Sequence, residues 1–423
     1  MGATDLTKLT RREFMKNGLV FGAGAAGLAA GYAAVPDVFA RAVYAGKKDG
    51  VMNDRVLVMI QLAGGADGLQ SVIPLNDPRL RDLRPTLSRA ADTALPLNTS
   101  VGLNRNMRGL KSLYDQGKVA IVQGVGYPKP NYSHFDSIRI WETADPERRQ
   151  QSGWLGKTIA ANYDSQGHPL VGCACGTSQI PGALRDLEAT LAVVNGKDTF
   201  RFNGQDAERA MGVIYNGTPG IYGALFDTSV YSARDTIARL RTSRDKYTPR
   251  ATYTDNVNLV YSSRNQLASA LQLAAQLIIS GVGAKILHVT LGGFDTHDQQ
   301  AARHDSLMGY VDSAVSAFHA DLAAYGMSDR VLIATWSEFG RRPQETANAG
   351  TDHGTAAPMF LIGDTVRGGL YGEAPSLEVG RGGNLRYSVD FRAVYQEILE
   401  SHMKVDAREV MGARYERIPA VAV

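Results

Sequence analysis

The chain has 423 residues, of which 44% are hydrophobic and 21% are charged, and its formal net charge is +3. This composition excludes a predominantly disordered chain, because enough apolar surface is available to offset chain entropy. Only 2 cysteines, and 45 glycines without a three-residue period, exclude disulfide-dense and collagen-like scaffolds. The near-neutral charge argues against nucleic acid as the main partner.

The N-terminal segment resembles a twin-arginine export signal. The sequence Thr-Arg-Arg-Glu-Phe-Met-Lys at residues 10–16 precedes a Gly- and Ala-rich apolar stretch at 19–34 and the cleavage pattern Ala-Arg-Ala at 40–42. We therefore expect residues 1–42 to be a removable signal peptide, read by the twin-arginine export machinery. The mature chain would then work in the periplasm or outside a bacterial cell. An amphipathic helix and an uncleaved anchor are the alternatives. No second apolar run of about 20 residues occurs, so no membrane span is expected in the mature chain.

The rest of the chain alternates between strand and helix patterns. Short apolar runs ending in glycine or polar residues predict buried strands at 55–62, 118–123, 284–291, 330–336 and 358–362. Helical spacing of apolar residues predicts helices at 106–114, 256–280, 298–325 and 391–403. This alternation favours a single α/β domain at residues 43–423, with a mostly parallel central sheet covered on both faces. The irregular, polar residues 176–255 are interpreted as a cap or insertion.

Polar residues gather where these strands end, and ligands bind beyond the carboxyl ends of strands in open α/β sheets. Carboxylates and imidazoles suit divalent ions, and six of them follow the predicted strands. This number would suit two ions sharing a cleft. The candidate metal ligands are Asp67, Asp295, His297, Glu338, Asp352 and His353.

Each candidate ligand also has a structural interpretation. Asp67 could be a turn residue, and Asp295 could cap the helix that follows it. Glu338 could pair with Arg341, and Asp352-His353 could form a loop turn.

Several motifs together resemble the secreted proteins grouped as domain of unknown function 1501, over residues 10 to 415. Besides the twin-arginine start they are Gly64 to Leu69, Ser133 to Ser137, Gly292 to His297, Ser337 to Arg341 and Gly350 to Gly354. That family is similar in its fold pattern to the alkaline phosphatase and sulfatase superfamily. The resemblance implies a three-layer α/β sandwich with one or two metals at a hydrolytic site.

The resemblance also suggests individual roles for the metal ligands. Asp67 resembles the first metal-binding aspartate of the superfamily, and His353 resembles its late His-Gly ligand. Asp295 and His297 resemble its Asp/His pair, with one residue between them rather than three. Glu338 occupies the place of another Asp-His pair, unless Asp352-His353 is that pair.

The nucleophile is less well defined by the resemblance. Ser133 is the available hydroxyl, but the usual spacing to the following histidine would place Pro130 in the nucleophile position. Ser133 could instead be the N-cap of a helix at 134–143, with a metal-activated water as the attacking group. His134 could donate a proton, and Arg341 could join it in stabilising the charge of the transferred group.

These observations predict an exported metal-dependent hydrolase of phosphate or sulfate esters, using one or two zinc, calcium or manganese ions. The substrate would be a small anionic ester or, in a third interpretation, a cell-surface polysaccharide. The alternative is a non-catalytic exported binding or assembly protein on a hydrolase-like scaffold, because a fold does not imply a function. The resemblance also implies a co-encoded secreted protein as a partner.

Overall fold

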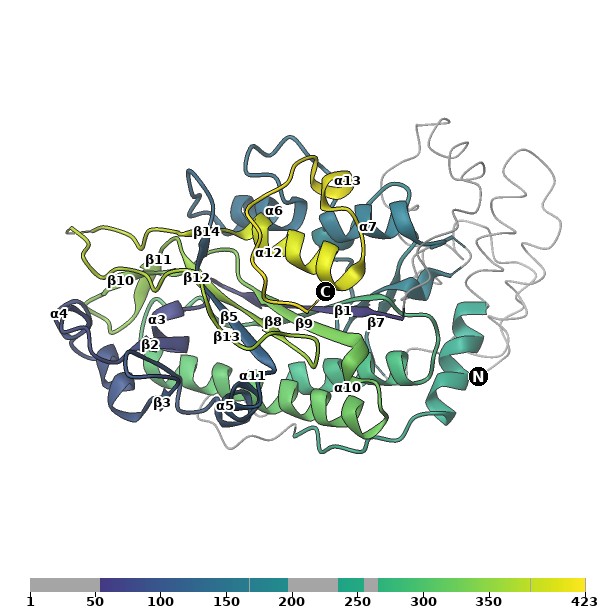
Figure 1. Cartoon of the computed structure of the whole chain (residues 1–423), viewed down its shortest axis with the longest axis horizontal. Helices are drawn as coiled ribbons and strands as arrows, with labels where there is room; N and C mark the ends of the chain where they lie inside the picture. The colour runs from purple at the N-terminus through teal and green to yellow at the C-terminus, as the bar shows by residue number, and fades with distance from the viewer. Residues whose placement is uncertain (1–53, 167, 197–234, 255–264, 381, 423) are drawn as a thin grey trace, which may run out of the picture.

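The computed structural model describes residues 54–166, 168–196, 235–254, 265–380 and 382–422. The predicted signal at 1–42 and residues 197–234 of the predicted cap lie outside these ranges. The described residues form three layers, with a central sheet between two layers of helices (Figure 1). The predicted three-layer α/β sandwich with a mostly parallel sheet is therefore confirmed.

The central sheet has the strand order β13-β5-β12-β9-β1-β8-β6-β7, and β14 pairs with β5 as a ninth strand. Only β12 runs antiparallel, against both β5 and β9; all other pairings in this sheet are parallel. The strands are β1 (Val56–Ala63), β5 (Val119–Gly126), β6 (Gly172–Cys175), β7 (Ala192–Val194), β8 (Ile286–Gly292), β9 (Val331–Trp336), β12 (Ala357–Ile362), β13 (Gly369–Tyr371) and β14 (Val389–Asp390). The edge strand β7 comes from the segment interpreted as a cap.

Helices cover both faces of the sheet, as Figure 1 shows. One face carries α5 (Arg108–Asp115), α10 (Gln266–Ile279) and α11 (Gln300–Ala324). The other carries α6 (His134–Thr143), α7 (Trp154–Asn162), α12 (Phe391–Glu397) with the π-helical turn Ile398–Met403, and α13 (Ala407–Met411). None of the helices in the described ranges is long and apolar enough to cross a membrane.

Burial on both faces explains why the central strands are continuous apolar runs. In β1 the side chains of Val58 and Ile60 pack in the core beneath α10 and α11, whereas Leu57 and Met59 pack in the core beneath α7 and α12. Successive side chains of a strand point to opposite faces, so one run of apolar residues supplies both cores.

Smaller elements lie beyond one end of the sheet (Figure 1). A three-stranded antiparallel sheet has the order β2-β4-β3, and a two-stranded ribbon pairs β10 with β11. The bounds are α3 (Gly68–Ser71), β2 (Val72–Pro74), α4 (Arg79–Leu83), β3 (Leu95–Pro96), β4 (Val101–Leu103), β10 (Arg341–Glu345) and β11 (Thr351–His353). Short 3₁₀ turns span Leu87–Thr93, Pro169–Val171, Gly182–Leu184 and Ser328–Arg330.

The parallel strands bring distant segments of the chain to one edge of the sheet. In the registers of β1 with β8 and β9, Ala63 lies opposite Gly292, and Gln61 lies opposite Trp336. The residues that follow β1, β8 and β9 therefore leave the sheet at nearly the same level. The segment after β5 leaves at this edge as well, because β5 is parallel to β9 through their shared antiparallel neighbour β12.

Candidate metal centre

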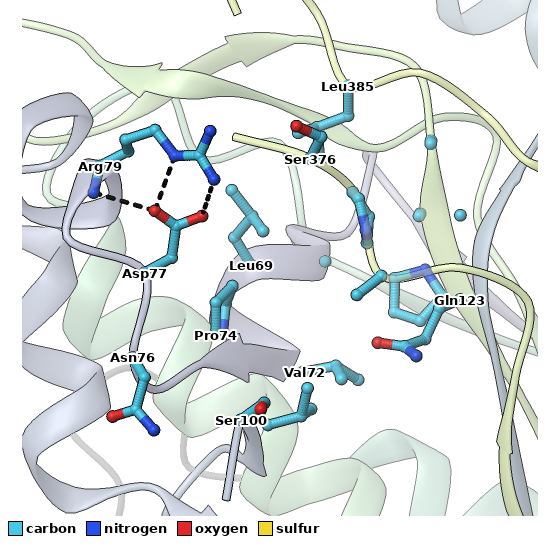
Figure 2. Close-up of a pocket in the computed structure, with 18 of the residues that line it drawn as sticks. Leu69, Val72, Pro74, Asn76, Asp77, Arg79, Ser100, Gln123, Ser376 and Leu385 are labelled. Atoms are coloured by element: carbon cyan, nitrogen blue, oxygen red, sulfur yellow. Dashed lines mark hydrogen bonds and ion pairs between the residues drawn. The ribbon is translucent and has the colours of Figure 1, made fainter. Parts of the chain in front are cut away.

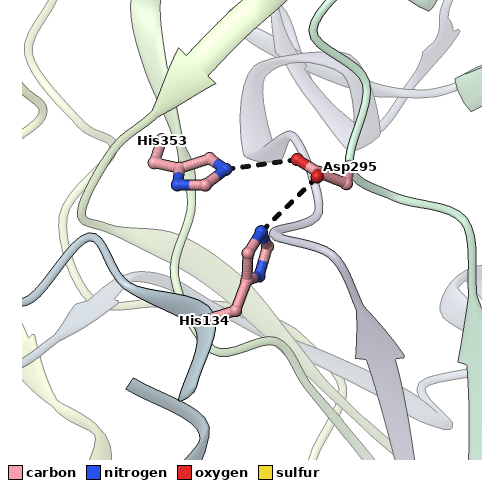
Figure 3. Close-up of side chains that lie close together, drawn as sticks. All are labelled: His134, Asp295 and His353. Atoms are coloured by element: carbon pink, nitrogen blue, oxygen red, sulfur yellow. Dashed lines mark hydrogen bonds and ion pairs between the residues drawn. The ribbon is translucent and has the colours of Figure 1, made fainter. Parts of the chain in front are cut away.

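Three potential metal ligands converge at this edge from different elements. His134 is the first residue of α6, Asp295 follows β8, and His353 ends β11. One nitrogen or oxygen atom from each lies within 4.8 Å of the others, and Figure 3 shows both rings turned toward the carboxylate. His297 is a fourth candidate, because its Nε2 lies 3.0 Å from both Asp295 Oδ1 and His353 Nε2.

In His134 and His353, Nδ1 points away from the centre, and its hydrogen-bond partner shows that it carries the ring proton. His134 Nδ1 lies 2.7 Å from Glu338 Oε1, which also accepts the backbone N–H of Gly64, so Nδ1 is the donor. His353 Nδ1 lies 2.8 Å from the carbonyl oxygen of Tyr132 and must also be a donor. In the neutral form of each ring, Nε2 therefore carries a lone pair that is directed into the centre.

The Nε2 lone pair of His134 faces a carboxylate rather than a donor. His134 Nε2 is buried, lies 3.5 Å from Asp295 Oδ2, and has no hydrogen-bond partner in the described part of the chain. His353 Nε2 lies 3.2 Å from Asp295 Oδ1 and 3.0 Å from His297 Nε2, which can donate to it. Lone pairs of nitrogen and oxygen at these separations repel each other unless a proton or a cation lies between them. The residues present therefore fit a divalent cation, whose histidine ligands typically donate their other N–H to a carboxylate or a backbone carbonyl.

Asp295 is held as an anion by its surroundings. Burial alone would raise the pKa of Asp295, but the hydrogen bond and charge of Arg341, together with the neighbouring His353 and His297, lower it to about 2. Its side chain is 47% exposed, so solvent can reach the centre. A carboxylate that stays ionised down to low pH is a suitable ligand for a cation.

Two glycines allow the loop after β1 to approach the loop after β8 and the ring of Phe339. A Cβ on Gly64 would collide with the backbone of Phe294 and Asp295, and one on Gly65 would meet the ring of Phe339. Both glycines have positive φ angles, of 121° and 77°, which disfavour other residues. The ring of Phe339 lies with its centroid 4.9 Å from that of His134 and 4.6 Å from that of His353, forming an apolar floor.

Glu338 and Asp352, predicted as ligands, lie behind the histidines. Glu338 is fully buried, and its contacts with Gly64 and His134 make it an orienting partner of His134. Asp352 Oδ1 lies 3.7 Å from Nδ1 of His297, on the side of that ring away from Asp295. Both carboxylates thus contact the outer nitrogen of a histidine, and neither belongs to the converging group.

Arg341, predicted to stabilise the charge of a transferred group, is buried and bonded to the surrounding loops. Its guanidinium donates to the carbonyl oxygens of Gly64, Gly65, Phe294 and Thr351 and to Asp295 Oδ1 at 2.6 Å. With the side chain 0% exposed, the guanidinium is not accessible to a substrate. Its contacts instead fix the positions of the loops after β1 and β8.

The contacts of Asp67 do not fit its predicted role as a metal ligand. It caps α3, and one of its oxygens pairs with Arg84 at 2.8 Å and accepts from Gln300. Both side chains of the ion pair are 0% exposed. Burial would raise the pKa of Asp67, but the charge of Arg84 and hydrogen bonds from Arg84 and Gln300 lower it. The cation that neutralises Asp67 is therefore an arginine.

Ser133 is exposed at the start of α6. Its hydroxyl makes no capping hydrogen bond, while its backbone N–H donates to Asn131 Oδ1. The cap interpretation thus lacks its defining contact, and the hydroxyl has no partner among the described residues.

Sequence reasoning did not identify His134 as a ligand or Arg84 as the partner of Asp67. The signal for His134 was its position between β5 and α6, which is the same strand-end signal that singled out Asp295. Arg84 ends a short helix 17 residues after Asp67, and no sequence pattern connects the two.

The fold and the site define an α/β protein with a histidine-rich candidate metal centre at the carboxyl edge of its sheet. The chain belongs to the family described as "Protein of unknown function (DUF1501)", whose model matches residues 120–418. No curated protein matches its sequence.

Three solved structures illustrate the similarity at the level of the fold. The C-terminal periplasmic domain of EcEptC from Escherichia coli, in complex with zinc, has 9% identity and a TM-score of 0.36, and 75% of each chain is covered. The alkaline phosphatase from the Antarctic bacterium TAB5 has 13% identity and a TM-score of 0.33, over 75% of this chain and 94% of that one. The PsFucS1 sulfatase from Pseudoalteromonas sp. has 12% identity and a TM-score of 0.34, over 81% and 70%. Similarities of this size do not assign an activity to the chain.

Proposed function

We propose that the chain is an exported metal-dependent hydrolase of phosphate or sulfate esters. His134, Asp295 and His353 would hold one divalent ion, with His297 as a fourth ligand. The observation that carries the proposal is the convergence of His134, Asp295 and His353, in which the unpartnered Nε2 of His134 is directed at the carboxylate of Asp295.

The donor set favours zinc among the expected ions. Imidazole nitrogens with one carboxylate are typical zinc ligands, whereas calcium takes oxygen ligands almost exclusively. A zinc ion bound here would act as a Lewis acid toward an ester oxygen and lower the pKa of water.

The residues of the chain would supply orientation and the attacking group. Glu338 and the Tyr132 carbonyl orient two histidines, and Phe339 supports both rings. Ser133 is the candidate nucleophile, because its exposed hydroxyl lies next to His134 in the chain and has no capping bond. If Ser133 attacks, the alcohol leaves with a proton and a phosphoryl or sulfuryl serine forms, which water then hydrolyses to free phosphate or sulfate.

Metal content tests the proposal directly. Protein purified without chelators is expected to contain about one equivalent of zinc, and removing the zinc should lower the melting temperature until zinc is added back. The variant Asp295→Asn should lose most of the metal. The matched control Asp115→Asn changes an exposed aspartate that pairs with Lys111 on α5 and should retain the metal.

Activity is then measured with 4-nitrophenyl phosphate, bis(4-nitrophenyl) phosphate and 4-nitrophenyl sulfate. Hydrolysis of at least one substrate should disappear with Asp295→Asn and persist with Asp115→Asn. A metal-free protein whose melting temperature does not respond to zinc, manganese or calcium would overturn the metal centre and with it the hydrolase.

The burial and internal hydrogen bonds of Arg341 favour a second candidate function, which is metal-dependent binding without catalysis. All the contacts of its guanidinium are internal, so the cation predicted to stabilise the transferred group is not available for that role. A zinc-loaded protein that hydrolyses none of the three substrates would favour this candidate.

A further inference from the structure

A cavity of about 700 Å³ lies apart from the metal centre, between α3, the small sheet β2-β4-β3 and residues 374–385. Figure 2 shows its walls, and none of its lining residues belongs to the histidine cluster. Its volume is that of a typical small-molecule site, and most of its lining is apolar, including Leu69, Val72, Val101 and Leu385.

One buried polar side chain in this cavity has no partner. Gln123 is only 6% exposed, and its side-chain amide forms no hydrogen bond with any described residue. In Figure 2 the amide is turned into the cavity, on the side of Val72. The amide atoms are not enclosed in the core, so a ligand in the cavity can bond to them without breaking a hydrogen bond within the described part of the chain.

Gln123 lies in a β-bulge, which determines the direction of its side chain. Between β5 and β12, Val125 pairs with Ala357 and Val122 with Met359, so Gln123 and Gly124 lie opposite the single residue Pro358. Gly124 has a φ of 63°, and Pro358 has no N–H to donate to the ladder. Bulges re-aim side chains and are common beside binding sites.

The cavity is lined by several prolines, and its two charged lining residues neutralise each other. Its four prolines, each with a fixed φ angle, limit the ordering that a ligand must impose; they are Pro74, Pro78, Pro358 and Pro375. Its charged lining residues, Asp77 and Arg79, bind each other through two bonds of 2.8 and 2.9 Å. A neutral ligand is therefore expected.

We propose that this cavity binds an N-acetylated sugar and that the Gln123 amide bonds to its acetamido group. An acetamido group offers one N–H and one carbonyl, which match the carbonyl and NH₂ of glutamine, and its methyl group suits the apolar walls. A peptide strand fits less well, because the adjacent edge strand β2 has three residues and ends in Pro74.

The cavity and the metal centre share a segment of the chain. Leu385 lines the cavity, and its neighbour Asn384 donates to the hydroxyl of Tyr132 at 3.3 Å. The carbonyl of Tyr132 in turn accepts from His353. The sugar site goes beyond the proposed hydrolase, and binding there requires no metal.

Calorimetric titration of the full chain with N,N′-diacetylchitobiose tests the proposal, with zinc and after chelation. Binding is expected in both conditions, and cellobiose, which lacks the acetamido groups, should bind at least about tenfold more weakly. Gln123→Leu should weaken chitobiose binding by about tenfold or more without loss of stability, because the amide forms no hydrogen bond with any described residue that the change would break. The matched control Gln116→Leu changes an exposed glutamine of α5's C-cap and should bind as the wild type does.

A second variant leaves the core unchanged. Ser376 is an exposed lining residue, and Ser376→Trp should block the cavity. Chitobiose that does not bind, or that binds Gln123→Leu and Ser376→Trp as tightly as the wild type, would overturn the proposal. Binding of trialanine in place of chitobiose would overturn the sugar assignment and identify a peptide site. Because these measurements do not need the metal, their outcome is separate from that of the hydrolase test.

Discussion

The buried side chain of Arg84 helps to fix the position of the ribbon of β10 and β11 beside the candidate metal centre. Arg84 donates to Asp67 and to the carbonyl oxygens of Arg342 and Pro343, so one side chain ties the end of β1 to the start of the ribbon β10. Gln300 connects Asp67 with Thr351 of β11 through its own amide. These internal bonds hold the ribbon that carries His353.

Replacing Arg84 should therefore be costly. Arg84→Met removes one partner of a fully buried ion pair, which leaves Asp67 uncompensated and typically costs about 3–5 kcal/mol. Arg81→Met is the matched control, because Arg81 pairs with Asp92 at the surface and exposed pairs contribute about 0–1 kcal/mol. Urea unfolding of both variants measures the difference. Equal free energies of unfolding would show that the Asp67–Arg84 pair does not stabilise the fold.

At the scale of elements, the ribbon of β10 and β11 is fitted closely against the loop after β8. A Cβ on Gly350, just before β11, would collide with the carbonyl oxygen of His297. The backbone N–H of Thr351 donates to the carbonyl of Thr296 at 3.2 Å. This contact sets the distance between His297 and His353, which come from two different elements.

Gly350→Ala should accordingly separate the two histidines. Overpacking of this kind typically costs about 1–3 kcal/mol of stability, and displaced ligands should weaken zinc binding about tenfold or more. Gly292→Ala is the control, because nothing lies within 4 Å of a Cβ at that position. Competition with a chromogenic chelator measures both affinities. If the two variants bind zinc equally, the ribbon does not position the centre.

Across the whole molecule, strand positions and strand ends could be predicted from the sequence because they depend on local patterns. Apolar runs followed by glycine or polar residues located β1, β5, β8 and β9, and the meeting of parallel strand ends placed Asp295 at this edge, whereas His353 reaches it on the antiparallel ribbon of β10 and β11. The antiparallel direction of β12 could not be predicted, because a short apolar run has no direction. The same holds for the proton on His353, which is set by the backbone carbonyl of Tyr132 rather than by any recognisable side chain.

Three buried histidines make the free energy of unfolding depend on pH. Burial lowers the pKa of His288, His304 and His402 to about 4, even though Asp67 and the Val56 carbonyl favour the protonated forms of His304 and His402. A solvated histidine in the unfolded chain has a pKa of about 6.5. Below that pH the unfolded chain binds protons that the folded chain does not bind. The free energy of unfolding is therefore highest above about pH 6.5 and falls as the pH decreases toward 4.

Removing one of these histidines should reduce that fall. One pKa unit corresponds to about 1.4 kcal/mol, so each histidine should cost roughly 2 kcal/mol between pH 7 and pH 5. His288→Leu should lose roughly 2 kcal/mol less than the wild type over this range, because leucine binds no proton. Met59→Leu is the control: Met59 lies opposite His288 in the register of β1 with β8 and does not titrate. Urea unfolding at both pH values gives the comparison, and the same loss in His288→Leu as in the wild type would contradict a buried, unprotonated His288.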